Sequence, residues 1–353
     1  MSKYLSYILN LRGAAILIVA GVHARGNVSE WSDSEGMFYL LSTIFDSREG
    51  NGTVMFIFIG GFLFQYITHQ SFDFRKYLEK KLLYVLLPYV LVSIPIIAFR
   101  IYTNYSYVLP PGFNDSSVIY RFFYYLVTGV HLAPFWFISA IVLFYISAPL
   151  FHALDNPKCY LYVLPVLFVA SLFTYRSAHN ANPLLSYIHY FPVYYLGMCA
   201  SYYRNEIFGS VNRIFYPLLI IYAGITLGNL MNWIPLHDFI TFQEVLQNRL
   251  MIFNLDLLKA VMLCFVLMLL LYKFREKRML FLEVLGEYSF GIFFVHCIFI
   301  YSTRNLWEHL FGAVHFSMLT FLIYFSFILL ISTVTVYFIK RMTGRYSRIL
   351  IGS

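Results

Sequence analysis

Residues 317–339 read SMLTFLIYFSFILLISTVTVYFI, an uncharged apolar run of 23 residues that decides the fold class. At 1.5 Å per residue, a helix of this length reaches about 35 Å, enough to cross the roughly 30 Å hydrocarbon core of a bilayer. Similar runs recur along the chain of 353 residues, of which 60% are hydrophobic and 12% charged. So few charges cannot cover a water-soluble fold of this size. The sequence therefore predicts an all-α, polytopic transmembrane helical bundle.

We predict about ten spans within a single membrane-embedded domain, residues 1–353. The expected spans are 7–25, 52–70, 79–102, 135–152, 160–176, 184–203, 214–230, 255–272, 286–304 and 317–339. The first of them begins like a secretory signal peptide, but Arg12 interrupts its apolar stretch. We therefore expect it to be a retained helix.

The positive charge follows the membrane topology. Formal net charge is +8, yet the basic residues are spread over short segments between apolar runs and form no basic domain, which argues against nucleic acid as a partner. If the N-terminus is cytoplasmic, 16 of the 25 basic residues fall in inner segments. The positive-inside rule then predicts that both termini are cytoplasmic.

Three predicted outer connections, 26–51, 103–134 and 231–254, are long and carry aromatic and charged residues. Connections of that length are more often functional than idle. The four cysteines contain no CxxC pair, and three of them lie within apolar runs, where cysteine usually behaves as a small hydrophobe. We expect neither a metal site nor a disulfide framework.

Arg12 and His23 place two polar groups in the first span. Eleven positions correspond to about 20° beyond three helical turns, so both side chains leave the same face, about 16 Å apart along the axis. An arginine at mid-span costs about 2.5–3.5 kcal/mol on insertion scales, which favours a bundle interior or a wet cavity. The alternative is that Arg12 extends to the inner surface and His23 caps the outer end of the helix.

Five segments in order resemble one family of membrane proteins. LRGAAI at 11–16, followed by His23, resembles the opening Arg-x10-His signature of the acyltransferase-3 family of integral membrane acyltransferases. The other four resembling segments are FIFIGGFL at 56–63, FRKY at 74–77 continuing to KKLLY at 80–84 and PY at 88–89, PFWFI at 134–138 ending at Pro149, and LGEYSFGIFFVH at 285–296. Two positions depart from the family pattern, since Gly60 replaces a common Ser and Tyr84 replaces the second basic residue of an RxxR motif.

The resemblance implies transfer of an acyl group, most often acetyl, from cytoplasmic acyl-coenzyme A to a hydroxyl of a sugar or another acceptor. An imidazole suits the removal of a hydroxyl proton during attack on a thioester, so we predict His23 as general base. A guanidinium stays charged in any pocket, so Arg12 would hold the pantetheine–phosphate arm of the donor or polarise the thioester.

The same resemblance implies further binding residues. Lys80 and Lys81, with Arg75, would bind the phosphates of coenzyme A at the cytoplasmic mouth; the alternative role is topogenic charge. Trp136 and His296 would line the tunnel or the acceptor site, although a tryptophan near a boundary is commonly an interface anchor. The expected acceptor is a cell-surface or exported polysaccharide or glycolipid, and the expected location is the plasma membrane of a bacterium.

Two other classes compete with an enzyme. A polysaccharide or lipid-linked-sugar exporter would also carry intramembrane ionisable residues, but the sequence shows no inverted repeat. A scaffold subunit of a glycan synthase needs no catalytic residues at all. Membrane lipids surround the chain in every case, and homo-oligomers or glycan-synthesis partners are compatible with each. Hydrolase, zinc-protease and nucleotide-binding motifs are absent from the sequence.

Overall fold

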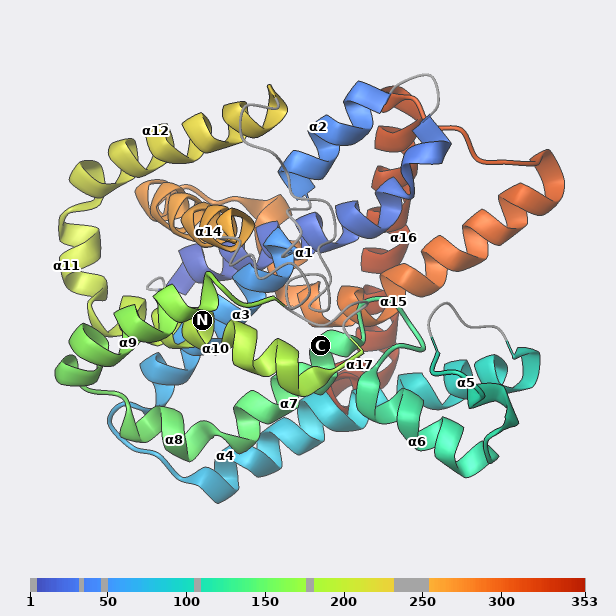
Figure 1. The fold of residues 1–353 in the computed structure, drawn as a ribbon, viewed down its shortest axis with the longest axis horizontal. Helices are drawn as coiled ribbons and strands as arrows, with labels where there is room; N and C mark the ends of the chain where they lie inside the picture. The colour runs from blue at the N-terminus through green and yellow to red at the C-terminus, as the bar shows by residue number, and fades with distance from the viewer. Residues whose placement is uncertain are drawn as a thin grey trace. The chain divides into compact units, whose positions relative to one another are not determined.

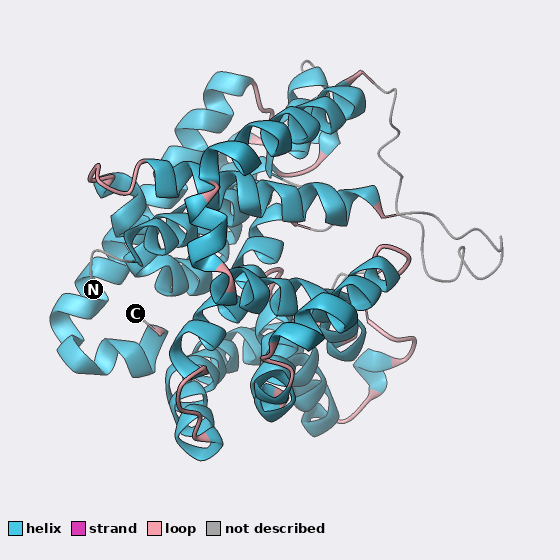
Figure 2. Ribbon diagram, turned by 90° about the vertical axis from the view of Figure 1, so that its left-hand side faces the viewer, coloured by secondary structure: helices cyan, strands magenta, loops and turns pink. Residues whose placement is uncertain are grey.

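The computed structural model describes residues 5–31, 35–45, 50–104, 109–175, 181–231 and 254–352 (Figure 1). Within these ranges the regular structure is helical, without strands (Figure 2). The chain divides into two compact units. The first unit comprises Met1–Tyr66, Val193–Phe239 and Phe253–Phe338, and the second comprises Ile67–Pro192, Ile240–Ile252 and Ile339–Ser353. The single domain expected from the sequence stays a prediction.

The first unit is built from the N-terminal helices, the middle of the chain and the long C-terminal helices. Its helices are α1 (Ser6–Arg25), η2 (Val28–Trp31), α2 (Glu35–Phe45), α3 (Asn51–Thr68), the C-terminal half of α10 (Pro183–Tyr202), α11 (Arg204–Gly209), α12 (Val211–Leu230), α14 (Leu255–Lys273), α15 (Leu280–Phe311) and α16 (Met318–Thr343). Its closest approaches are made at glycines. A Cβ added at Gly61 of α3 would lie 1.9 Å from the carbonyl oxygen of Tyr194, so the backbones of α3 and α10 touch there.

The second unit begins with a long continuous helical stretch. Its helices are α4 (Phe74–Lys81), the π-helical turn η3 (Leu82–Leu86), α5 (Leu87–Thr103), η4 (Phe113–Asp115), α6 (Val118–Thr128), α7 (Trp136–Ile146), α8 (Ala148–Ala153), α9 (Pro157–Ser171), the N-terminal half of α10, η6 (Gly344–Tyr346) and α17 (Ser347–Ile351). Ile97, Phe113 and Tyr125 form a small buried core between α5, η4 and α6.

Among the described residues, seven helices are long and apolar enough to cross a membrane. They coincide with the predicted first, second, third and seventh to tenth spans, which confirms a polytopic helical membrane protein. The predicted spans 160–176 and 184–203 fall on α9, which has 15 residues, and on α10, which has 20 residues with five tyrosines. The count of ten and the cytoplasmic side of the termini stay predictions.

The predicted fourth span, 135–152, is not one helix. It is divided at Ser147 into α7 and the short α8. Pro149 explains the division, because a proline inside a helix removes a backbone hydrogen bond and clashes with the preceding turn, whereas in a first turn it does neither. The helix therefore ends and restarts so that Pro149 occupies the first turn of α8.

Two of the long outer connections contain helices of their own. Within 26–51 lies α2, and within 103–134 lies α6. The bounds of α6 follow local signals: the Ser117 hydroxyl accepts the backbone N–H of Tyr120, and Gly129 ends the helix with a φ of 75°. The third connection, 231–254, lies almost wholly outside the described residues.

Candidate functional site

Helices α1 and α15 cross at two glycines in the first unit. A Cβ added at Gly13 would lie 2.2 Å from the carbonyl oxygen of Leu282, and one added at Gly286 would lie 2.1 Å from that of Leu9. No side chain larger than hydrogen fits at either position. Small residues at a crossing allow helix backbones in a membrane to approach closely. The two glycines therefore bring the polar side chains of α1 against α15.

Arg12 makes its hydrogen bond across this crossing. Its Nη2 donates to Oγ of Ser289 at 2.9 Å, and the Ser289 hydroxyl donates in turn to the carbonyl oxygen of Gly286 at 2.9 Å. Ser289 is fully buried and Arg12 is partly buried. A guanidinium has five donors, so this bond leaves further N–H groups for another acceptor. Arg12 therefore points to the helix interface.

His23 lies near the other end of α1, also against α15. Its ring centroid is 5.4 Å from that of His296. His296 is completely buried, and its Nδ1 lies 2.9 Å from the carbonyl oxygen of Ile292. Because a carbonyl can only accept, Nδ1 carries the hydrogen and Nε2 is left as an acceptor. That Nε2 lies 3.4 Å from Sγ of Cys297.

The C-terminal turn of α1, which carries His23, is held by donors from outside the helix. The last carbonyls of a helix have no partner within it. Arg304 Nη2 donates to the carbonyl of Ala24 at 3.0 Å, and Trp31 Nε1 donates to that of Arg25 at 3.0 Å. Arg304 also pairs with Glu30 at 2.8 Å. These bonds fix the turn from which His23 projects.

Helices α1 and α15 run in the same direction. Leu9 meets Gly286 near their N-terminal ends, and Ala24 meets Arg304 near their C-terminal ends. A common direction is what two odd-numbered spans of one bundle require, and the side of the membrane on which they begin stays a prediction. Arg12 and His23 both contact α15, as a shared face requires.

The three predicted phosphate-binding cations lie in the second unit and differ from one another. Lys80 is exposed, whereas the ammonium of Lys81 lies 4.8 Å from the ring centroid of Tyr145. Arg75 is exposed, and its Nε is 3.0 Å from Oε1 of Glu79 on its own helix. Of the three, Lys80 is the most available to a phosphate in water.

The N-terminus of α4 is capped by Asp73. Its carboxylate accepts the backbone N–H of Lys76 at 3.0 Å and lies 3.3 Å from the ammonium of the same residue. The backbone hydrogen bond and the nearby charge of Lys76 lower the pKa of this carboxyl. This cap fixes where the basic helix begins.

Tyr84, where the family pattern expects a second basic residue, lies within η3. The guanidinium of Arg348 in α17 lies over the Tyr84 ring, 5.6 Å from its centroid. A positive charge is thus present beside Tyr84, but it comes from the C-terminal end of the chain. Sequence reasoning missed this because residues 84 and 348 are 264 positions apart. The π-helical turn is the one local signal, since such turns are common at functional sites.

Trp136 is the first residue of α7 and is buried, with 8% of its surface exposed. Its ring stacks on that of Tyr190 at 6.3 Å between centroids, within the second unit. The role of Trp136 in a tunnel or acceptor site stays a prediction.

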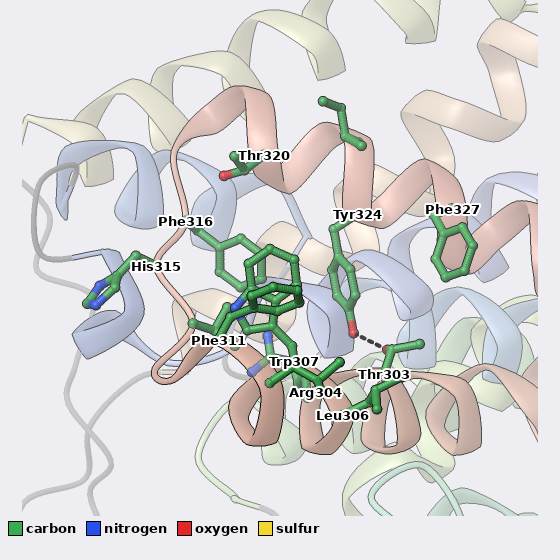
Figure 3. A pocket seen from close by; sticks show the side chains of 13 residues that line it. Thr303, Arg304, Leu306, Trp307, Phe311, His315, Phe316, Thr320, Tyr324 and Phe327 are labelled. Carbon is green, nitrogen blue, oxygen red and sulfur yellow. Dashed lines mark hydrogen bonds between the residues drawn. The ribbon is translucent and has the colours of Figure 1, made fainter.

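An apolar hollow of about 490 Å³ lies between the C-terminal end of α15 and the beginning of α16 (Figure 3). Its wall includes Trp307, Phe311 and Phe316, and the Tyr324 hydroxyl bonds to Thr303 Oγ1 at 3.0 Å. Neither Arg12 nor His23 lines it. Arg304 connects the hollow to the C-terminal turn of α1. It lines the hollow, and it also donates the hydrogen bond that holds the turn carrying His23.

These features define a class: an integral membrane protein with an arginine and a pair of histidines at the interface of two membrane-length helices. Comparison with known families shows a match to the acyltransferase-3 profile, described as an acyltransferase domain, over residues 5–340. The chain belongs to the acyltransferase-3 family, which confirms the resemblance seen in its sequence. No curated protein and no solved structure matches it.

Proposed function

We propose that this protein moves an acyl group, most simply acetyl, from cytoplasmic acyl-coenzyme A to a hydroxyl of a cell-surface or exported polysaccharide or glycolipid. The observation that carries the proposal is the arrangement of Arg12 with Ser289 and of His23 with His296 along one helix pair. Membership of the acyltransferase-3 family supports acyl transfer as the chemistry.

His23 is the proposed general base. It accepts the proton of the acceptor hydroxyl as that oxygen attacks the thioester carbonyl, and a new C–O bond forms while the C–S bond breaks. Coenzyme A leaves as a thiolate and takes the proton back from His23, so the base is regenerated. The unprotonated Nε2 of His296 can accept but not donate a hydrogen bond, which suits it to orient the acceptor hydroxyl or the His23 ring.

Arg12 is better suited to hold the donor than to polarise the thioester. The helical rise places it about 16 Å from His23 along α1, too far to act on the same carbonyl. The long pantetheine–phosphate arm of coenzyme A can cover that length. Arg12 would therefore bind an amide or phosphate oxygen of the arm, with Ser289 holding the guanidinium in place.

Lys80 is proposed to bind the nucleotide phosphates, with Lys81, Arg75 and Arg348 adding positive charge in the same unit. The excess of basic residues in the predicted inner segments supports a cytoplasmic position for them. The proposed location is the plasma membrane of a bacterium, where coenzyme A is on one side and exported glycans are on the other.

The decisive experiment is mass spectrometry of the surface glycan from cells that express the wild type, the His23→Ala variant or no protein. The proposal expects one acyl mass on the glycan with the wild type alone. Equal acylation in all three strains would overturn it. Unmodified glycan that fails to reach the surface without the protein would instead support the exporter.

A further inference from the structure

Three ligand atoms of the kinds that bind transition metals meet at the α1–α15 interface. His23 comes from α1, and His296 and Cys297 come from α15. One ring nitrogen of each histidine and Sγ of Cys297 all lie within 4.8 Å of one another. This cluster could not be predicted from the sequence, because Cys297 lies in an apolar run and His23 is 273 positions before His296.

His296 is already arranged as a ligand. Its Nδ1–H donates to the carbonyl of Ile292, so the lone pair of Nε2 points away from that bond. Metal-binding histidines almost always donate their second nitrogen to such a partner, which fixes the tautomer and the ring orientation. The Nε2 faces Sγ of Cys297 at 3.4 Å, and both residues are at most 1% exposed.

His23 completes the set from the more open side. It is partly exposed, while the other two are buried. Among the residues that the structure describes, His23 makes a ring contact with His296 but no hydrogen bond, so its nitrogens are not committed.

The distances fit a small tetrahedral ion after modest side-chain movement. Zinc lies about 2.0–2.1 Å from imidazole nitrogen and about 2.3 Å from thiolate sulfur, so in a tetrahedral site the two nitrogens and the sulfur are about 3.3–3.6 Å apart. The 3.4 Å between His296 and Cys297 already lies in this range. The widest separation, at most 4.8 Å, must close by up to about 1.5 Å, which rotation of the His23 side chain can provide.

We propose that His23, His296 and Cys297 form a binding site for Zn²⁺ or a similar soft divalent ion. One thiolate and two imidazoles select such ions over Mg²⁺ or Ca²⁺, which prefer oxygen. Binding releases the thiol proton of Cys297 to solvent, while both imidazoles bind as neutral groups. Three protein ligands leave a fourth position for water.

The ion inhibits acyl transfer, and this consequence rests on the proposed function. A nitrogen lone pair of His23 that coordinates a metal cannot also accept a proton from the acceptor hydroxyl. The site therefore makes the enzyme sensitive to zinc rather than dependent on it. Ion binding itself does not depend on the proposed reaction.

The first test is spectroscopic and uses the purified full-length protein in detergent with Co²⁺ as probe. The wild type should bind one ion with a sulfur-to-cobalt charge-transfer band and the intense visible bands of tetrahedral cobalt. Cys297→Ser should lose the charge-transfer band. Cys264→Ser is the matched control, since Cys264 is equally buried in α14 and should leave the spectrum unchanged. No band in the wild type, or an unchanged band in Cys297→Ser, would overturn the site.

The second test measures transfer rate against Zn²⁺ concentration. Wild-type activity should fall with zinc and return with a chelator, and Cys297→Ser, measured relative to its own zinc-free rate, should need at least about tenfold more zinc for half inhibition. Undiminished activity at zinc concentrations that saturate the site would refute inhibition. A protein that shows the cobalt spectrum but no acyl transfer would refute the proposed function and leave the metal site standing.

Discussion

The α1–α15 pair and the α4–η3–α5 stretch both carry basic residues, but the hydrogen-bond partners of those residues differ. In the first region the partner comes from another helix, and in the second it comes from the same helix. Arg12 bonds to Ser289 on another helix, whereas Arg75 bonds to Glu79 one turn away on its own exposed helix. An exposed pair of that kind contributes about 0.2–0.5 kcal/mol and needs no tertiary fold. An arginine at mid-span costs about 2.5–3.5 kcal/mol to insert, so it is kept only where another helix offers a partner or a substrate does. The first region is built by packing and the second by local sequence.

Breaking the glycine crossing should have the largest effect. Gly13→Ala and Gly286→Ala each place a Cβ about 2 Å from a backbone carbonyl oxygen, which cannot move away like a side chain. Overpacking of this kind costs about 1–3 kcal/mol or more. We expect little folded protein and no transfer activity, measured as the monodisperse fraction and the unfolding temperature in detergent.

Gly224→Ala is the matched control for that prediction. Gly224 is also inside a membrane-length helix, α12, but a Cβ there meets nothing within 4 Å. Alanine is favoured over glycine in a helix interior by about 0.5–1 kcal/mol, so this variant should be as stable as the wild type or more so. Equal behaviour of all three variants would show that α1 and α15 do not touch at their glycines.

Removing the proposed base should leave the fold and lower the rate. His23→Ala should reduce transfer by about 10²–10⁴-fold, the usual contribution of a positioned acid–base group, while acyl-coenzyme A binding persists. The turn that carries residue 23 is still held by Arg304 and Trp31. His309→Ala, the same change at an exposed position of α15, should be silent. A wild-type rate in His23→Ala would remove His23 from the mechanism.

The sequence predicted features that depend on local periodicity. Apolar runs predicted the membrane-length helices, and helical arithmetic placed Arg12 and His23 on one face, which agrees with their common contact with α15. The break at Ser147 was missed because hydropathy averages over Pro149.

Features that join distant parts of the chain could not be predicted. Nothing in the sequence around Cys297 shows that His23 lies beside it, and nothing around Tyr84 shows that Arg348 lies over its ring.

The packing around Gly60 explains why the chain can depart from the family pattern at that position. A Cβ at Gly60 would meet the Tyr194 ring at 3.4 Å, an ordinary contact, so either glycine or a small residue fits there.

Replacing the guanidinium of Arg12 should have an intermediate effect on the binding of acyl-coenzyme A. The substitution by lysine distinguishes the contribution of the positive charge from that of the planar hydrogen-bond donors. Arg12→Lys keeps the charge but loses the planar set of donors, so we expect a rise in the apparent dissociation constant of acyl-coenzyme A of about tenfold or more. Ser289→Ala should show a smaller change in the same direction, because Arg12 keeps its donors but loses the hydroxyl that holds it. If Arg12→Lys binds the donor like the wild type, Arg12 serves only to place charge at the membrane.

The smallest expected effect concerns the exposed cations of α4. Lys80→Gln should raise the KM for acyl-coenzyme A by about 1.4- to fivefold with little change in kcat, because an exposed charge contributes about 0.2–1 kcal/mol. Arg75→Gln should change the KM less, since Glu79 already neutralises Arg75 locally.

The difference in KM between the two variants should shrink as the salt concentration rises, because solvent-exposed charges are screened over about 8 Å at physiological ionic strength. Lys76→Gln, on the same helix but paired with Asp73, is the control and should match the wild type. An equal rise in all three variants would mean that α4 contributes only net charge, and no change in any of them would leave its basic residues with a topogenic role.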